Sequence, residues 1–128
     1  MEHYQKRIYY HDTDAGGVVY YANYLKYLEE ARTEYMRAKG IDLKEITKQG
    51  IWFVVKGVDI QYRSPGRYAD ILDISSEIIK TKNVSLEFTQ EVKRKDDILV
   101  CAKTTLVCVT DQFRPTPIPQ EILDKLAS

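Results

Sequence analysis

The sequence has no excess charge of either sign, because Lys and Arg together number 19 and Asp and Glu together also number 19. A chain without net charge has no long-range field that would draw the whole molecule onto nucleic acid or an anionic membrane. Long hydrophobic runs are also lacking, and the N-terminal residues are polar. We therefore expect no nucleic-acid partner, no signal peptide, no integral membrane segment and a cytoplasmic location.

Cysteine is scarce. Cys101 and Cys108 stand seven residues apart in one predicted strand, which places them on opposite faces and about 23 Å apart. A disulfide between them is excluded at that separation. No Cys or His lies at ligand spacing from either thiol, so we predict no metal site and two reduced, packed cysteines.

One long helix is the clearest element of the chain. Apolar residues recur at steps of three and four from Tyr24 to Ala38, charged residues cover the other side, and Gly40 supplies a C-terminal stop. Before it, residues 2–10 are predicted to form a strand and residues 12–17 a loop. After it, residues 41–50 are predicted to form a short helical turn or loop.

The period of apolar residues changes to two from Trp52 onward, which predicts four strands of nearly ten residues each. Turn residues interrupt them at 64–68, 80–83 and 95–97, so we expect an antiparallel meander. A single domain, 1–128, of the α+β class results, with a curled antiparallel sheet wrapped around the long helix. The predicted inward faces are Val54, Val58, Ile60 and Tyr62, then Leu72, Ile74 and Ile78, then Val84, Leu86, Phe88 and Val92, then Ile98, Val100, Ala102, Leu106 and Cys108.

Two further segments extend this expectation. Residues 52–55 are apolar on both faces, which predicts that a second subunit covers the far side of the sheet. After Pro115, Pro117 and Pro119, residues 120–127 are predicted to form a short helix that begins after proline.

A loop rich in Asp and Gly stands directly before the long helix: Asp12, Thr13, Asp14, Ala15, Gly16, Gly17. A carboxylate beside the backbone N–H groups of a helix start suits acyl transfer, since the carboxylate can act as base or nucleophile and the N–H groups can hold an oxyanion. An ordinary turn is the simplest alternative. Calcium fits poorly, because an EF-hand register puts Gly16 and Asn23 at two ligand positions, and a phosphate loop lacks its Gly-Lys-Ser/Thr.

The loop and the helix after it resemble those of a known family. The motif Asp-Thr-Asp followed by Gly-Val-Val, an aromatic pair, and helical Glu29, Ala31 and Arg32 resembles the hotdog-fold acyl-CoA thioesterases. The closest resemblance is to the YbgC group of the 4-hydroxybenzoyl-CoA thioesterase family, and it extends to residues 58–65, 85–90 and 107–109. It implies a hotdog fold, hydrolysis of acyl-CoA to a free acid and CoA without a further cofactor, and homodimers or homotetramers with the site between subunits. Acyl carrier protein is a possible partner.

The resemblance also implies the site residues. Asp14 is expected to be catalytic, as nucleophile or general base, and the backbone N–H of Tyr21 to bind the thioester oxygen. Members of the YbgC group usually carry His where this chain has Tyr21, so a side-chain role at this position is not carried over. The expected substrate-binding residues are Gly17, Val18, Asn23, Lys80 and Lys82. Asn23 either bonds the reacting carbonyl or caps the helix. Lys80 and Lys82 stand at the turn that resembles the family's nucleotide anchor.

Several alternatives stay open on the sequence alone. Arg63 and Arg67 are further candidates to hold the nucleotide, and Tyr20, Tyr21, Tyr24 and Tyr27 either line an acyl tunnel or pack the core. A non-catalytic module that binds acyl-CoA or acyl carrier protein on the same fold is the rival function. Glu29 is the alternative catalytic carboxylate, because another branch of hotdog thioesterases uses one on the helix.

Overall fold

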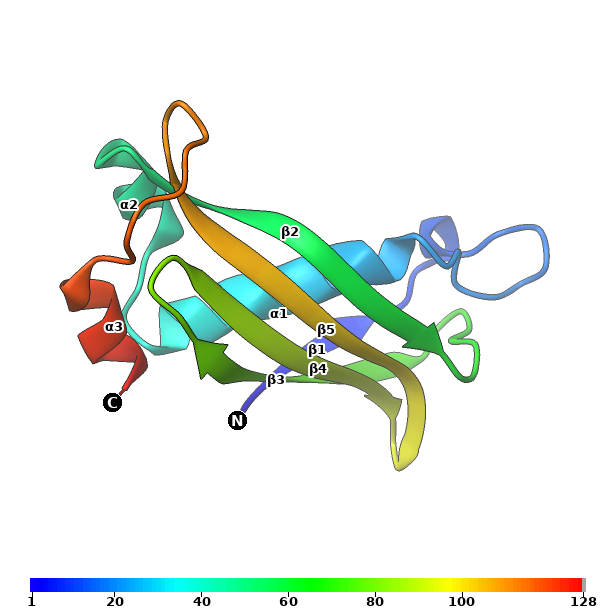
Figure 1. Cartoon of the computed structure of the whole chain (residues 1–128). Helices are drawn as coiled ribbons and strands as arrows, with labels where there is room; N and C mark the ends of the chain where they lie inside the picture. The colour runs from blue at the N-terminus through cyan, green and yellow to red at the C-terminus, as the bar shows by residue number, and fades with distance from the viewer. Residues whose placement is uncertain (128) are drawn as a thin grey trace.

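A five-stranded antiparallel sheet and one long helix packed along its face make up most of the fold (Figure 1). The structure is a computed structural model that describes residues 1–127. The elements are β1 (Glu2–Arg7), a 3₁₀ turn (Tyr10–Asp12), α1 (Asn23–Ala38), α2 (Leu43–Lys48), β2 (Ile51–Tyr62), β3 (Ile71–Thr81), β4 (Ser85–Arg94), β5 (Asp97–Thr110) and α3 (Gln120–Leu126). No helix within residues 1–127 is long and apolar enough to cross a membrane.

Helix α1 forms where the apolar pattern predicts it, and Gly40 ends it. Gly40 adopts a φ of +80° and donates its N–H to Arg37 O, and Ile41 donates to Met36 O. These two bonds form a Schellman motif, which needs a residue that tolerates positive φ at the position of Gly40.

The strand order corrects the predicted meander. Strands β3, β4 and β5 follow one another as a meander, but β2 pairs with β5 and the order across the sheet is β1-β3-β4-β5-β2. The eight residues 63–70 therefore cross from one edge of the sheet to the other side, where β3 pairs with β1. A connection of eight residues is longer than the two to five typical of a hairpin, which is the physical sign that β2 and β3 are not neighbours.

A β-bulge in β2 corrects one predicted face. The register against β5 shifts between Val55 and Gly57, and one extra residue moves every following side chain to the other face. Val54 therefore lies on the opposite face from Val58, Ile60 and Tyr62. The other three strands keep their predicted apolar rows, except that a bulge opposite β4 buries Leu99 rather than Ile98.

Two apolar clusters fill the space between α1 and the sheet. The loop-end cluster contains Ile8, Val19, Tyr24, Tyr27, Leu28, Ala31, Leu72, Ile74, Val92, Leu99, Val100 and Ala102. The far-end cluster contains Tyr35, Met36, Ile41, Ile46, Leu86, Phe88, Leu106, Cys108, Ile118 and Ile122, the last two from the tail and α3. Both cysteines are free, with Cys108 buried in the far-end cluster and Cys101 on the other face of β5, as predicted.

A belt of buried polar side chains separates the two clusters. Gln90 donates through Nε2 to Leu28 O and to Ser76 Oγ, each at 3.0 Å, and accepts from Arg32 at 3.2 Å. Thr104 lies next along the belt on β5, and its hydroxyl is buried without a hydrogen-bond partner in the described chain. This polar belt thus marks a boundary within the core that the strand periodicity does not reveal.

Candidate active site

The loop that carries Asp14 projects from one end of the molecule (Figure 1). Asp14 Oδ1 accepts the Gly16 N–H at 2.8 Å, Asp14 N–H donates to Val18 O at 2.9 Å, and Gly17 N–H donates to Asp14 O at 3.0 Å. Gly17 adopts a φ of +78°, which favours glycine at this position. The exposed carboxylate is thus held by its own loop through one oxygen, which leaves the other for chemistry.

A second chain segment supports the loop from the side. Val19 N–H donates to Gly66 O at 2.8 Å, and Val18 forms a β-bridge with Arg67. Gly66 in turn donates its N–H to the Tyr24 hydroxyl at 2.9 Å. A Cβ added at Gly66 would lie 3.0 Å from that hydroxyl and 3.1 Å from Val19 Cγ2, so a larger residue here would require one of these neighbours to shift by a few tenths of an ångström. The loop is therefore fastened to the turn at 64–68 and through it to α1.

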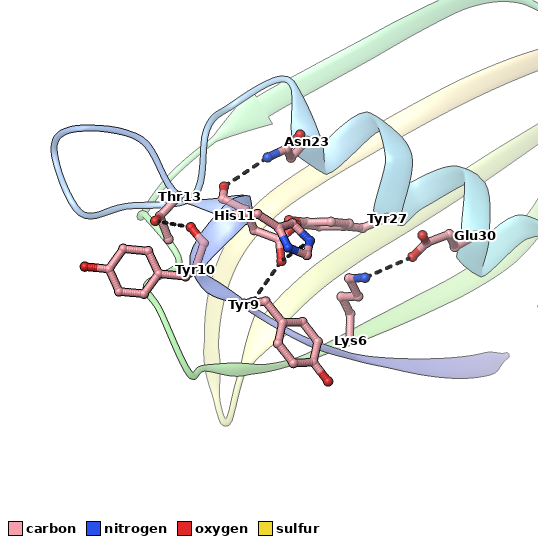
Figure 2. A network of polar contacts seen from close by, with 9 residues as sticks. Lys6, Tyr9, Tyr10, His11, Thr13, Asn23, Tyr27 and Glu30 are labelled. Atoms are coloured by element: carbon pink, nitrogen blue, oxygen red, sulfur yellow. Dashed lines mark hydrogen bonds and ion pairs between the residues drawn. The ribbon is translucent and has the colours of Figure 1, made fainter.

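Asp12 holds the base of the loop through hydrogen bonds with Tyr9, Asn23 and Tyr27, which Figure 2 labels. Its buried carboxylate accepts the Tyr27 hydroxyl at 2.7 Å and the Tyr9 N–H at 2.8 Å, and its carbonyl accepts the Tyr20 N–H at 3.0 Å and Asn23 Nδ2 at 2.9 Å. The sequence alone places Asp12 in the loop and in the family motif but indicates no contact with the helix. The signal that could have pointed to it is the pairing of an Asp before the helix with a Tyr on the helix's buried stripe.

The helix start leaves backbone donors unused. Tyr20 N–H is bonded to Asp12 O, and Asn23 N–H to Tyr20 O, whereas the N–H groups of Tyr21 and Ala22 have no acceptor within residues 1–127. These two groups stand at the N-terminus of a 16-residue helix, where the helix dipole adds partial positive charge. The expected oxyanion donor, Tyr21 N–H, is thus available for a ligand oxygen.

Asn23 does not cap the helix. Ala22 occupies the N-cap position without a side-chain bond, and Asn23 is the first helical residue, with its amide nitrogen on Asp12 O. The capping expectation is therefore wrong, because the 3₁₀ turn brings the Asp12 carbonyl within reach of the amide. The Asn23 side chain instead ties α1 to the base of the loop.

The four aromatic candidates divide into two pairs. Tyr24 and Tyr27 are each only 2% exposed, so they belong to the core, while Tyr20 and Tyr21 are exposed beside the loop. Tyr62 packs edge-on against the Tyr21 ring and donates its hydroxyl to Tyr21 O at 3.3 Å. Of the four, only the exposed pair is placed to contact a ligand.

Lys80 and Lys82 lie far from Asp14 within the chain. Arg7, which precedes the loop, pairs with Ile71 at the start of β3, and Lys80 is nine residues farther along that strand. At about 3.3 Å per residue, Lys80 lies roughly 30 Å along β3 from the Arg7–Ile71 pair. The turn lysines and the loop carboxylate are therefore not brought together within a subunit, whereas Arg67 lies directly beside the loop.

Comparison with known proteins places this arrangement in a family. The model of the thioesterase-like superfamily matches residues 9–126. The acyl-CoA thioester hydrolase YbgC of Escherichia coli O6:H1 is 37% identical over 119 residues, which cover 91% of this chain and 89% of that protein. A crystal structure of a hypothetical protein from Aquifex aeolicus superposes with a TM-score of 0.94 at 28% identity, over 98% of this chain and 99% of the other.

A more distant structure supports the fold alone. The 1,4-dihydroxy-2-naphthoyl-CoA thioesterase of Synechocystis superposes with a TM-score of 0.90 at 22% identity, covering 98% of this chain and 95% of the other. The loop, the open helix start and these matches lead to one conclusion. The chain belongs to the thioesterase-like superfamily and is a thioester hydrolase of the hotdog fold.

Proposed function

We propose that this thioester hydrolase cleaves acyl-CoA, with Asp14 as nucleophile or general base and the Tyr21 N–H as oxyanion donor. One observation carries the proposal: an exposed carboxylate stands on a loop fixed at both ends, beside backbone N–H groups that have no acceptor in the described chain. The related hydrolases named for acyl-CoA support the choice of substrate.

Two routes use the same groups. In the first, Asp14 takes a proton from water as the water oxygen attacks the thioester carbon; the C–S bond then breaks, and CoA leaves as the thiol with the proton that Asp14 returns. In the second, an Asp14 oxygen attacks the carbon, CoA thiolate leaves, and water then hydrolyses the resulting anhydride. In both, negative charge develops on the carbonyl oxygen, where the Tyr21 N–H stabilises it. A backbone donor does not depend on whether the side chain is Tyr or His.

The site is completed by a second copy of the chain in this proposal. Strand β2 forms a sheet edge of 12 residues, and its side chains Val55, Val58 and Tyr62 are 51%, 40% and 45% exposed. A long apolar edge requires cover. Antiparallel pairing of two β2 edges about a two-fold axis covers it and forms a homodimer, and two such dimers form the homotetramer.

The same two-fold axis gives the turn lysines a role. Antiparallel edges reverse the ends of the two subunits, so the β3–β4 turn of the partner subunit points toward the Asp14 loop. Lys80 and Lys82 then serve as nucleotide anchors for the neighbouring site, since CoA phosphates require cations. Gly17, Val18 and Asn23 line the acyl side of the loop, and acyl carrier protein is an alternative carrier of the same thioester.

Release of thiol tests the function. We expect the native chain to release CoA from at least one of acetyl-, butyryl-, palmitoyl- and hydroxybenzoyl-CoA, and Asp14→Asn to lose at least ~100-fold in kcat/KM. Asp96→Asn, at the exposed β4–β5 turn, is the matched control and should retain full activity. Binding of acyl-CoA without thiol release would instead support a non-catalytic binding module, and activity that survives Asp14→Asn would redirect attention to Glu29.

A further inference from the structure

The Asp12 carboxylate is a buried charge for which the proposed chemistry has no use. The residue is only 6% exposed. Both oxygens point inward, one to the Tyr27 hydroxyl at 2.7 Å and the other to the Tyr9 N–H at 2.8 Å. A carboxylate enclosed in this way cannot contact the substrate, so its cost of burial calls for a different explanation.

Asp12 joins three parts of the site at one residue. The loop leaves the fold immediately after it, and the returning end of the loop donates the Tyr20 N–H to its carbonyl at 3.0 Å. Tyr27, on the second turn of α1, reaches back to its carboxylate (Figure 2). Because the Tyr20 N–H is used at Asp12, the next donor along the chain, Tyr21 N–H, is the first one left free for substrate.

The electrostatics keep the Asp12–Tyr27 pair in one protonation state. Burial alone raises the pKa of Asp12, but the bonds from Tyr27 and the Tyr9 N–H outweigh it and lower the pKa overall. Burial, followed by the bond to Asp12, raises the pKa of the Tyr27 phenol. The titratable groups that face the pair are His11, whose Nε2 is 3.8 Å from Asp12 Oδ2, and Lys6, whose ammonium lies 5.3 Å from the Tyr27 ring and 3.9 Å from Glu30.

We infer that Asp12 and Tyr27 form a positioning pair for the thioesterase reaction, which fixes the Asp14 loop against the oxyanion donor of Tyr21. The inference rests on the proposed function. The other buried tyrosines of α1 make different contacts: Tyr24 accepts from Gly66, in the turn that supports the loop from the side, and Tyr35 lies in the far-end cluster. Of the described hydroxyls on α1, only that of Tyr27 bonds the residue that anchors both ends of the loop.

Removal of one hydroxyl tests the pair. Tyr27→Phe keeps the ring in the core, and we expect kcat to fall ~10- to 100-fold with KM within ~3-fold, because small displacements of reacting groups cost rate rather than binding. Tyr35→Phe makes the same change at the other end of α1. It should lower the melting temperature about as much as Tyr27→Phe does, but keep kcat within ~2-fold of the native value. The dependence of kcat on pH should keep its shape in Tyr27→Phe, with lower values throughout. Equal kcat losses in the two variants, or full activity of Tyr27→Phe, would overturn the inference.

A second substitution separates positioning from chemistry. In Asp12→Asn, the amide can accept from Tyr9 and donate to the Tyr27 oxygen, so the geometry is retained without the charge. We expect it to keep activity within ~10-fold of the native chain, in contrast to Asp14→Asn. If Asp12→Asn is as inactive as Asp14→Asn, Asp12 is a chemical participant and the positioning role is wrong.

A measurement without turnover distinguishes this inference from the proposed function. Amide hydrogen exchange across residues 13–21 should accelerate at least ~10-fold in Tyr27→Phe and remain native in Tyr35→Phe. Native-like exchange in Tyr27→Phe refutes the positioning pair even if no acyl-CoA is cleaved. Conversely, suppose that exchange accelerates in Tyr27→Phe but the native chain releases no thiol. That result upholds the pair as a loop anchor and rejects the proposed hydrolysis of acyl-CoA.

Discussion

The two core clusters meet the same sheet and the same helix but are built from different side chains. The loop-end cluster includes Tyr24 and Tyr27, whose hydroxyls bond Gly66 and Asp12. The far-end cluster is closed by aliphatic and aromatic groups such as Phe88 and Ile122. Its Tyr35 ring packs edge-on against the Phe88 ring, with 5.2 Å between the ring centroids. The Tyr35 hydroxyl also has a backbone partner, Ile78, but only the loop-end hydroxyls bond segments that flank Asp14.

The difference shows where the fold uses polar atoms. Burying each hydroxyl at the loop end costs desolvation free energy, but its hydrogen bond fixes the position of a segment that flanks Asp14. At the far end, Ile118 of the tail and Ile122 of α3 cover the cluster by apolar contact. Stability and catalytic geometry should therefore respond to different substitutions.

The largest effect is expected from breaking the far-end cluster. Phe88 is fully buried, and Phe88→Ala should lower the free energy of unfolding by about 3–5 kcal/mol, because it leaves a cavity in a close-packed core. Urea unfolding measures this loss, and kcat per folded molecule at low temperature should stay within ~2-fold. A fall in kcat equal to that of Tyr27→Phe would show that the two clusters are not separable.

A smaller effect should distinguish the loop end by its response to acid. The pKa of Asp12 is lower in the fold than its ordinary value of 3.8, so its stabilisation is complete above that value and is lost as the pH falls through the folded pKa. Asp12→Asn should therefore cost about 1–2 kcal/mol near neutral pH, and progressively less once the pH falls below 3.8. The cost of Phe88→Leu, measured by the same urea titrations, should not vary with pH; a parallel variation would contradict the assignment.

The smallest effect concerns the boundary between the clusters. Thr104 is fully buried and its hydroxyl has no partner among residues 1–127. Thr104→Val replaces that hydroxyl with a methyl group of similar size and should stabilise the fold by about 1 kcal/mol. Thr105→Val, on the opposite face of β5, is the control and should change the melting temperature little. Destabilisation by Thr104→Val would mean that a water or ligand normally satisfies the hydroxyl.

The local parts of the fold were predictable and the long-range parts were not. Helix α1, its Gly40 stop and the long strands follow from periodicity and turn residues close in sequence. The position of β2 beside β5 depends on which distant strand it pairs with, and the bulge that turns Val54 outward depends on a register that no local pattern encodes.

The site divides in the same way. The Asp14 loop and the free Tyr21 N–H lie within one short motif, so the sequence located both. The Asp12–Tyr27 contact joins residues 15 positions apart, across a loop whose path had to be known first. The lysine turn was recognisable as basic, but its distance from the loop is set by the length of β3.

The placement of the two thiols gives the native chain its own reporter of assembly. Burial raises the pKa of the Cys108 thiol and leaves it mostly protonated, hence slow toward alkylating reagents. Cys101 is partly exposed on the outer face of the sheet, the face that residues 52–55 lead us to expect a second subunit to cover. The alkylation rate of Cys101 across a dilution series would therefore follow that association without any label added by mutation.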